Sequence, residues 1–365
     1  MKKAGIVTFH NALSYGAALQ SYALQQFLNK NGIANDIIDY ECDYINNRYK
    51  KVISIEKSNI PKSFIGSVLK AGNKSKSLKL SAAFRKKYMS LSKNCTRQSV
   101  GSLVDEYSVF ISGSDQVWSP TCAGFDKTYL LDFAKSGQKF SYAASFGTKE
   151  VPEDKKSEYV KLLSDFSAIS VRESSGSDLV TNLTGMESQV NVDPTILLDR
   201  NDWNKVADDN VEPKDKYIFV FSVQKPKRLV DYAVKLGREK GLKVYYLNDM
   251  HIPKKDGLEY LSPVGPDGFV GLIKNAEYVV TNSFHASVFS LIYHKKLIME
   301  FESLGKRNNR SEELLARLGI SGIEIADGKT PNPDMKIDWT KVDQVFEDER
   351  KRSADYILNI KKTIK

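Results

Sequence analysis

The feature that most constrains the fold of this chain is a repeated alternation of short apolar runs with stretches of helical spacing. Residues 4–9 form an apolar run, residues 16–28 carry apolar side chains at helical spacing, and residues 33–40 read as a second strand. A strand, a helix and a strand within about forty residues form a βαβ unit, whose two strands are parallel. The start of the chain therefore predicts a parallel sheet.

The alternation continues along the chain in two blocks. In the first block, further strands are predicted at 108–112, 139–144 and 168–172, and helices at 154–166 and 174–183. In the second block, strands are predicted at 217–223, 243–247, 278–281 and 297–301, and helices at 227–240, 266–275 and 284–293. A polar linker at 201–216 separates the blocks, and a last helix is predicted at 342–360.

This pattern predicts an α/β protein with two doubly wound, Rossmann-like domains. We place the first domain at residues 1–205, the second at 206–340 and a C-terminal helix at 341–365. In doubly wound folds, ligands bind at the carboxyl ends of the strands, so we expect the ligand site in a cleft between the two domains.

The positive charge of the chain is concentrated in one window. The formal net charge is +9, but residues 48–97 hold 14 Lys or Arg and the single acid Glu56, so this window carries +13 and the rest −4. Two pieces of it, 61–71 and 80–89, have helical spacing and are separated by a Gly-Asn-Lys-Ser break. Because the basicity is local and lacks an aromatic-interleaved basic motif, a nucleic-acid-binding protein is disfavoured.

The composition excludes further classes of protein. No run reaches the roughly 18 apolar residues that span a bilayer, and the start lacks the apolar h-region of a signal peptide. The three cysteines, Cys42, Cys95 and Cys122, lie far apart without CxxC spacing. They read as reduced thiols and not as a disulfide framework or a metal site, so we expect a soluble, cytoplasmic protein without a metal.

In the first domain, two segments that follow predicted strands contain side chains able to carry chemistry. The turn with Asn11, Tyr15 and Gly16 precedes a helix whose N-terminus could bind a phosphate, although a glycine there also serves close packing. Ser114 and Asp115 stand in the turn Ser-Gly-Ser-Asp-Gln-Val-Trp. This turn offers a base and an aromatic platform for a sugar; the alternative is an aspartate cap beside a core tryptophan.

Two further segments supply a cation and a histidine. Arg172 ends a predicted strand, where its guanidinium could clamp a phosphate or carboxylate; the alternative is a surface pair with Glu173. Asn282, Ser283 and His285 follow a predicted strand of the second domain. His285 is the best placed of the four histidines for proton transfer near neutral pH, although a lone histidine is more often structural.

Together these motifs resemble the polysaccharide pyruvyl transferase family. The matching pieces, in order, are Tyr15-Gly-Ala-Ala-Leu-Gln20, Gly113-Ser-Asp-Gln-Val-Trp118, Tyr142-Ala-Ala-Ser-Phe-Gly147, Val171-Arg-Glu173, Asp193-Pro-Thr195 and Thr281-Asn-Ser-Phe-His-Ala286. The resemblance implies a fold like that of the B-type glycosyltransferases. It also implies a reaction that joins pyruvate from phosphoenolpyruvate (PEP) to a sugar diol as a ketal, with PEP as co-substrate and with no cofactor or metal.

Family roles transfer only to matching positions. The resemblance implies that His285 is the general acid or base and that Arg172 lies in the donor pocket. Asp115 lies where some members have an acidic residue, so we expect it to be a base or an acceptor ligand. Many members have an arginine where this chain has Ser283. A replacement cation could come from Lys225, Arg307 or Arg310.

The resemblance also gives the basic window a purpose. Acceptors in this family are often glycans carried on a lipid diphosphate, and residues 48–97 could hold the protein against anionic lipid at the inner membrane face. A solvated helical insertion explains the window equally well. Two alternative functions stay open: a glycosyltransferase that uses a nucleotide sugar, and a catalytically inactive glycan-binding relative.

Overall fold

The computed structural model describes residues 3–50, 62–211, 213–223, 225–247, 255–301, 309–326 and 328–364. The chain divides into two compact units. Unit 1 comprises Met1–Val52, Arg85–Leu198 and Phe346–Lys365, and unit 2 comprises Ile53–Phe84 and Asp199–Val345. The division after Leu198 lies close to the domain boundary predicted after residue 205.

Unit 1 is built on a parallel sheet of four strands in the order β2-β1-β3-β4. These strands are β1 (Lys3–Val7), β2 (Asn35–Ile37), β3 (Tyr107–Ser112) and β4 (Lys139–Ser141). Two short parallel strands follow, β5 (Ser170–Val171) and β6 (Gln189–Val190), and isolated bridges such as Ala144 with Val171 join β5 to the segment after β4. The parallel βαβ start predicted from the sequence is confirmed.

The helix that follows β1 in unit 1 begins at a serine cap. The helices of unit 1 include α1 (Tyr15–Lys30), α2 (Asp43–Lys50), α4 (Glu153–Leu163) and α5 (Ser174–Thr184). In α1, the N-cap Ser14 accepts a hydrogen bond from the Ala17 amide, and small and aliphatic residues such as Leu24 and Leu28 are buried. This cap places the turn after β1 directly against a helix start.

The helix α3 (Lys62–Tyr88) is continuous, so the predicted break at Gly72-Asn-Lys-Ser75 is wrong. A glycine inside a helix costs about 1 kcal/mol relative to alanine, which is too little to end a helix of this length. The Ser77 hydroxyl also donates back to the Asn73 carbonyl at 3.0 Å, within the turn of helix that follows the glycine. Residues 51–61 of the basic window lie outside the described residues.

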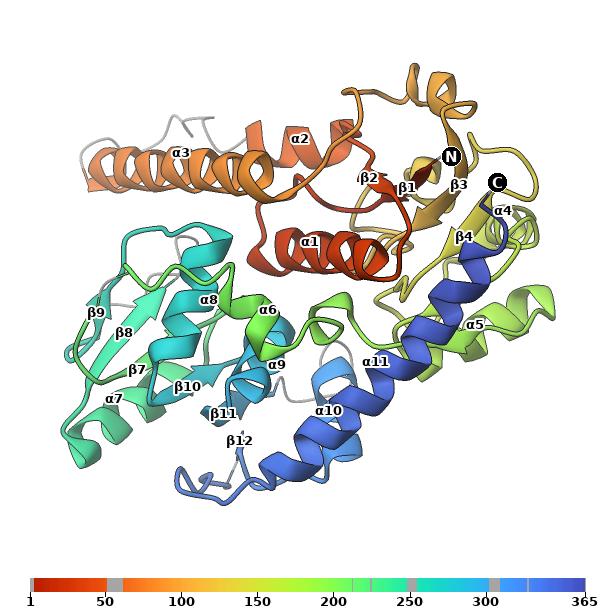
Figure 1. Ribbon diagram of the computed structural model, residues 1–365. Coiled ribbons are helices and arrows are strands. Elements are labelled where there is room, and N and C mark those ends of the chain that lie inside the picture. Colours follow the sequence, from red (N-terminus) through yellow and green to blue (C-terminus); the bar gives the residue numbers. More distant parts are fainter. Residues whose placement is uncertain are drawn as a thin grey trace. The chain divides into compact units, whose positions relative to one another are not determined.

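The last helix, α11 (Trp339–Lys361), packs its C-terminal half on unit 1 near β4 (Figure 1). The Tyr356 hydroxyl donates to the Ser141 carbonyl at 2.8 Å, and the Tyr142 hydroxyl donates to Ser353 Oγ at 2.9 Å. The helix predicted at 342–360 is therefore present, and its end belongs to the first unit.

Unit 2 contains a parallel sheet of six strands in the order β12-β11-β10-β7-β8-β9. The strands are β7 (Tyr217–Phe221), β8 (Lys243–Leu247), β9 (Glu259–Tyr260), β10 (Tyr278–Thr281), β11 (Lys296–Glu300) and β12 (Glu324–Ile325). The helices are α6 (Arg200–Asn204), α7 (Leu229–Lys240), α8 (Pro266–Asn275), α9 (Phe284–Ile292) and α10 (Asn309–Leu318).

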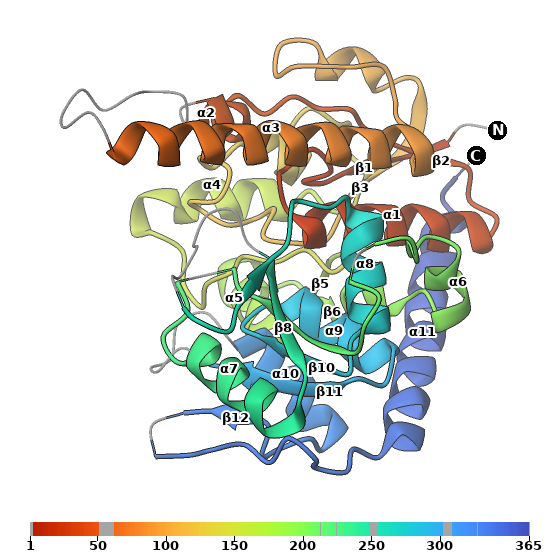
Figure 2. The same ribbon diagram turned by 90° about the vertical axis from the view of Figure 1, so that its left-hand side faces the viewer.

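Helices cover both faces of this second sheet. Leucine and valine side chains of α7 share a core with Ile218, Val220 and Val280, whereas Phe221 on the opposite face packs edge-on against Phe269 of α8. Figure 2 shows α7 and α8 on opposite sides of β8. The sheet is therefore doubly wound, as predicted.

One predicted loop contains a helix. α6 (Arg200–Asn204) overlaps the start of the segment 201–216, which was predicted to be a linker. Asp199 and Asp202 form a reciprocal capping box at its start, which explains why a short polar segment is helical.

Candidate functional site

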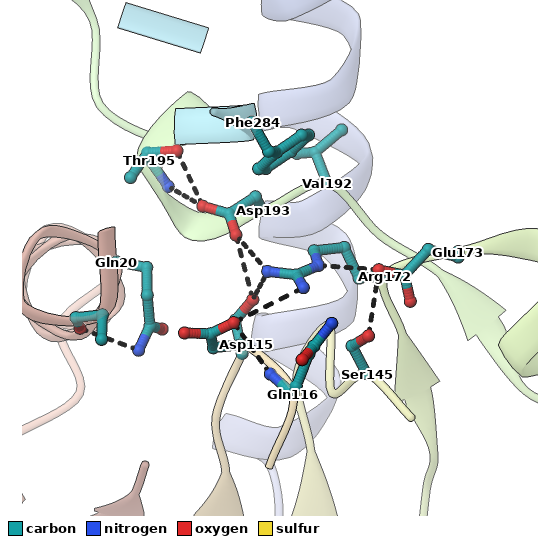
Figure 3. Close-up of polar contacts among 12 residues, drawn as sticks. Gln20, Asp115, Gln116, Ser145, Arg172, Glu173, Val192, Asp193, Thr195 and Phe284 are labelled. Atoms are coloured by element: carbon teal, nitrogen blue, oxygen red, sulfur yellow. Dashed lines mark hydrogen bonds and ion pairs between the residues drawn. The ribbon is translucent and has the colours of Figure 1, made fainter. Parts of the chain in front are cut away.

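Arg172 follows β5, and three carboxylates surround its guanidinium (Figure 3). Nε lies 3.0 Å from Glu173 Oε1, Nη1 donates to Asp193 Oδ2 at 2.8 Å, and Nη2 lies 3.7 Å from Asp115 Oδ1. Only 2% of the Arg172 side chain is exposed, and the Asp193 side chain is fully buried. The Arg172–Glu173 pair therefore exists, but it is buried and not a surface pair.

The charge balance of this cluster is negative. One guanidinium faces three carboxylates, which leaves a formal charge of −2 when all four groups are ionised. Burial opposes the charge on Arg172, but the attraction of Glu173, Asp193 and Asp115 outweighs it and raises the guanidinium pKa above its ordinary value. A place for Arg172 in a donor pocket stays a prediction, because its guanidinium pairs with three carboxylates of the chain itself.

Local turns hold the carboxylates in place. Asp193 Oδ1 accepts hydrogen bonds from the Thr195 amide at 3.0 Å and the Thr195 hydroxyl at 2.7 Å, in the Asp-Pro-Thr turn after β6. The Ser145 hydroxyl donates to Glu173 Oε1 at 3.0 Å, and the Ser114 hydroxyl donates to Asp193 at 3.2 Å. Asp193 was not predicted as a site residue, although the Asp193-Pro-Thr195 turn is one of the six pieces that resemble the family.

Asp115 has an unusual backbone conformation for its position after β3. Its φ is 71°, in the left-handed region that few residues other than glycine adopt. Its side chain is 18% exposed, and its Oδ1 accepts a hydrogen bond from the Gln116 amide at 2.9 Å. Trp118 is 1% exposed and its indole donates to Ser112 Oγ at 3.0 Å, so the predicted aromatic platform is wrong and the tryptophan belongs to the core.

Polar groups in the turn after β1 form hydrogen bonds with other residues of the chain. Asn11 Nδ2 donates to the Tyr40 carbonyl at 3.2 Å, while its buried Oδ1 has no hydrogen-bond partner among the described residues. Gly16 is buried and Tyr15 is half-buried at the first turn of α1. Ser14 already caps this helix, so a phosphate is not needed to satisfy that end of it. The turn therefore fits the alternative in which Gly16 serves close packing.

Unit 2 places three predicted residues at the junction of β10 and α9. Asn282 Oδ1 accepts a hydrogen bond from the Val223 amide at 2.8 Å. Ser283, at the position where the resemblance implies an arginine in many family members, is the N-cap of α9, and its hydroxyl accepts a hydrogen bond from the Ala286 amide. His285 is half-buried in the first turn of α9. Ser283 therefore supplies a helix cap worth about 1 kcal/mol at a position where an arginine would supply a cation.

The proposed replacement cations have different surroundings. The Arg310 guanidinium lies over the Phe284 ring, 5.2 Å from its centroid, one residue from His285. Arg307 lies outside the described residues, and Lys225 is exposed. Of the three, Arg310 is the one that the described structure brings next to the α9 start.

A second helix start in unit 2 is occupied by a carboxylate of the chain. Glu300, at the end of β11, accepts hydrogen bonds from the amides of Lys227, Arg228 and Leu229 at 3.2, 2.5 and 3.2 Å. These amides form the N-terminal turn of α7, where anions commonly bind in α/β proteins. In this chain Glu300 supplies the anion.

The described part of the chain has no group of three or more His, Cys, Asp or Glu that could hold a metal ion. None of its helices is long and apolar enough to cross a membrane. All three cysteines are free, and burial raises the thiol pKa of Cys42 and Cys95 to about 11, which makes them poor nucleophiles.

Several solved structures share this fold at low sequence identity. MnaA of S. aureus with UDP aligns with a TM-score of 0.50 and 11% identity over 95% of this chain and 87% of that chain. A putative UDP-N-acetylglucosamine 2-epimerase of Listeria monocytogenes gives 0.51 and 10% over 100% and 96%, and the glycotransferase of kitacinnamycin gives 0.50 and 10% over 100% and 99%. The chain therefore has the two-domain Rossmann-like fold of the B-type glycosyltransferase class.

The sequence narrows this class further. The profile of the polysaccharide pyruvyl transferase family matches residues 15–299, which is most of the chain. The protein belongs to the polysaccharide pyruvyl transferase family, and the resemblance found in the motifs is confirmed. No curated protein matches the chain.

Proposed function

We propose that this protein forms a pyruvate ketal on a sugar of a surface polysaccharide or of its precursor, with PEP as donor. The observation that carries the proposal is the family match over residues 15–299, which includes Asp115, Arg172 and His285. The atoms balance without any further reactant: PEP and a sugar diol give the ketal and inorganic phosphate. The reaction needs a proton donor and a proton acceptor, which histidine and aspartate can supply.

The proposed steps use His285 and Asp115. His285 gives a proton to the PEP methylene carbon, which makes C2 electron-poor. Asp115 accepts the proton of the first sugar hydroxyl as its oxygen bonds to C2. The C2–O bond to phosphate then breaks and phosphate leaves. The oxygen of the neighbouring hydroxyl bonds to C2 and closes the ketal, and its proton passes to His285, which restores the acid.

The charge around Asp115 supports contact of this residue with the acceptor sugar over contact with the donor PEP. A cluster with a formal charge of −2 repels a trianion such as PEP and attracts hydroxyl donors. In this proposal Arg172 positions Asp115, and a direct contact of Arg172 with PEP would require the guanidinium to exchange one carboxylate for the donor.

The first test is a thermal-shift titration with PEP, beside inorganic phosphate and a panel of nucleotide sugars. A ligand at a hundred times its dissociation constant adds about 2.7 kcal/mol of stability, which moves Tm by several degrees. We expect a shift with PEP. A shift with a nucleotide sugar and none with PEP would establish a glycosyltransferase instead, and no shift with any ligand would favour a binding protein.

The second test is turnover with a pool of bacterial glycans, read as phosphate release and as a product heavier by one pyruvic acid less one water. We expect His285→Ala to lower turnover by about 10²–10⁴-fold with little change in Tm. His294→Ala is the matched control, since His294 pairs with Asp343 at 2.8 Å. Unchanged turnover in His285→Ala would refute the acid role.

We also propose that the basic window contacts anionic membrane. Each well-placed lysine near such a surface contributes about 1 kcal/mol. The variant replaces four exposed lysines of α3 by glutamate: Lys76, Lys79, Lys86 and Lys87. A control with the same charge change replaces exposed lysines elsewhere: Lys149, Lys161, Lys216 and Lys351. Only the first variant should lose binding to vesicles of phosphatidylserine and phosphatidylcholine; equal binding by both would refute the contact.

A further inference from the structure

Gln20 lies in the buried part of α1, and the orientation of its side-chain amide is fixed. Nε2 donates to Thr8 Oγ1 at 2.8 Å and to the Ala17 carbonyl at 3.0 Å. Because a carbonyl oxygen only accepts, the amide nitrogen must face Ala17, and the reversed assignment is excluded. Thr8 Oγ1 in turn donates to the Ser114 carbonyl at 3.1 Å, which ties Gln20 to the turn that carries Asp115.

The amide oxygen of Gln20 is left without a hydrogen bond. Gln20 is 0% exposed, its Oε1 has no partner among the described residues, and Figure 3 shows the side chain pointing toward Asp115. A buried acceptor left unsatisfied is destabilising. Gln25 on the same helix is 1% exposed and has both amide atoms bonded to the Ser90 backbone at 2.9 Å. Of these two buried glutamines of α1, only Gln20 has an amide oxygen without a hydrogen bond.

The amide oxygen of Gln20 and the carboxylate of Asp115 cannot form a hydrogen bond with each other. An amide oxygen and an ionised carboxylate both only accept hydrogen bonds. A ligand that contacts both must bring two donors, and the −2 formal charge around Asp115 selects against an anion. The Asp115 side chain is 18% exposed, so approach from solvent leads first to Asp115.

We infer that Gln20 and Asp115 together recognise the two neighbouring hydroxyls of the acceptor sugar, one hydroxyl donating to each oxygen. This inference rests on the proposed function and deepens it. The hydroxyl at Asp115 loses its proton to the carboxylate and bonds first to the donor carbon. Gln20 holds the second hydroxyl, which later closes the ketal, so Gln20 is a specificity residue for diols.

The experiment measures binding of methyl hexosides that differ in configuration at C2, C3 and C4, each with its monodeoxy analogues, by calorimetry in the presence of PEP. For the hexoside that binds wild type, we expect Gln20→Leu to weaken binding about tenfold. The analogue that lacks the second hydroxyl should bind Gln20→Leu and wild type equally, because the interaction is already lost. Gln25→Leu is the matched control and should change neither value.

The outcomes separate this inference from the proposed function. If Gln20→Leu weakens the parent hexoside and all its monodeoxy analogues equally, its role is structural and the inference fails. If PEP binds but none of the hexosides binds, the inference also fails, while PEP remains supported as the donor. If PEP causes no thermal shift, the proposed function itself fails. If Gln20→Leu does not fold, Thr8→Val replaces it: removal of the hydroxyl that holds the amide should reduce the diol preference, and an unchanged preference refutes the inference.

Discussion

Replacing Arg172 by methionine should destabilise unit 1 strongly. The substitution keeps an unbranched side chain of similar length but removes the guanidinium that pairs with both Asp193 and Glu173. The side chains of Asp193 and Glu173 are 0% and 9% exposed, so water cannot replace the guanidinium without opening the structure. The carboxylates would be left buried and mutually repulsive.

The expected loss is about 3–5 kcal/mol, the range for removing one partner of a buried ion pair. The full range applies here because the Arg172 side chain is only 2% exposed and solvent screening is weak. At about 2–4 °C per kcal/mol for a unit of this size, Tm should fall by roughly 6–20 °C. Arg172→Lys, which keeps the charge but not the fork of donors, should lose less.

An exposed arginine of the same unit supplies the control. Arg97 pairs with Asp132 through both terminal nitrogens, but its side chain is 44% exposed. Because exposed pairs contribute about 0–1 kcal/mol, Arg97→Met should be nearly neutral. The contrast between the two methionine variants isolates burial as the cause.

The assay is urea unfolding followed by tryptophan fluorescence. Trp118 is the one tryptophan of unit 1, whereas Trp203 and Trp339 lie in unit 2. A background in which Trp203 and Trp339 are phenylalanine therefore reports the unfolding of unit 1 alone, where a two-state fit applies. A loss below 1 kcal/mol in Arg172→Met, or a loss equal to that of Arg97→Met, would refute the reasoning.

Three further predictions concern stability. Ser283→Ala should lower the free energy of unfolding of unit 2 by about 1 kcal/mol in a urea titration, because the cap of α9 is lost; unchanged stability would contradict that cap. Glu300→Gln should cost about 1–3 kcal/mol in the same assay, since a charged acceptor of three amides becomes neutral, and a neutral result would contradict its role at α7. The hydrogen bond with His10 lowers the pKa of Asp39 below 3.8, so the ionised carboxyl stabilises unit 1 above pH 3.8 and this stability is lost as pH falls through the lower folded value. Asp39→Asn should therefore be less stable than wild type at pH 6, and the difference should close below pH 3.8; a difference independent of pH would contradict it.

The sequence predicts the central elements of the fold well and its edges poorly. The bounds of β8, β10 and α8 agree with the prediction because each is a continuous run of suitable residues with a glycine, a charged residue or an asparagine within two residues of each end. The strands β9 and β12 have two residues each, too few for any periodicity to appear. Their pairing is fixed by the neighbouring strand and not by their own sequence.

The sequence predicts which residues belong to the candidate site, but not which side chains contact one another there. Asp115 and Arg172 could be singled out because both follow strands that the sequence pattern predicts to be parallel, and the carboxyl ends of parallel strands lie at one edge of a sheet. The neutralisation of Arg172 by Asp193 could not, since the two are brought together by the pairing of β5 with β6. Gln20 stands within a matched motif, but only the assembled contacts of Thr8 and Ala17 show which way its amide points.

The left-handed backbone at Asp115 has a consequence for protein engineering. A φ of 71° costs about 1 kcal/mol for a residue with a side chain and nothing for glycine. A library of this protein selected for heat resistance alone should therefore enrich glycine at position 115, and the enriched variants would be robust but without the carboxylate. The degree of enrichment would measure how much conformational energy the chain stores to present this one side chain.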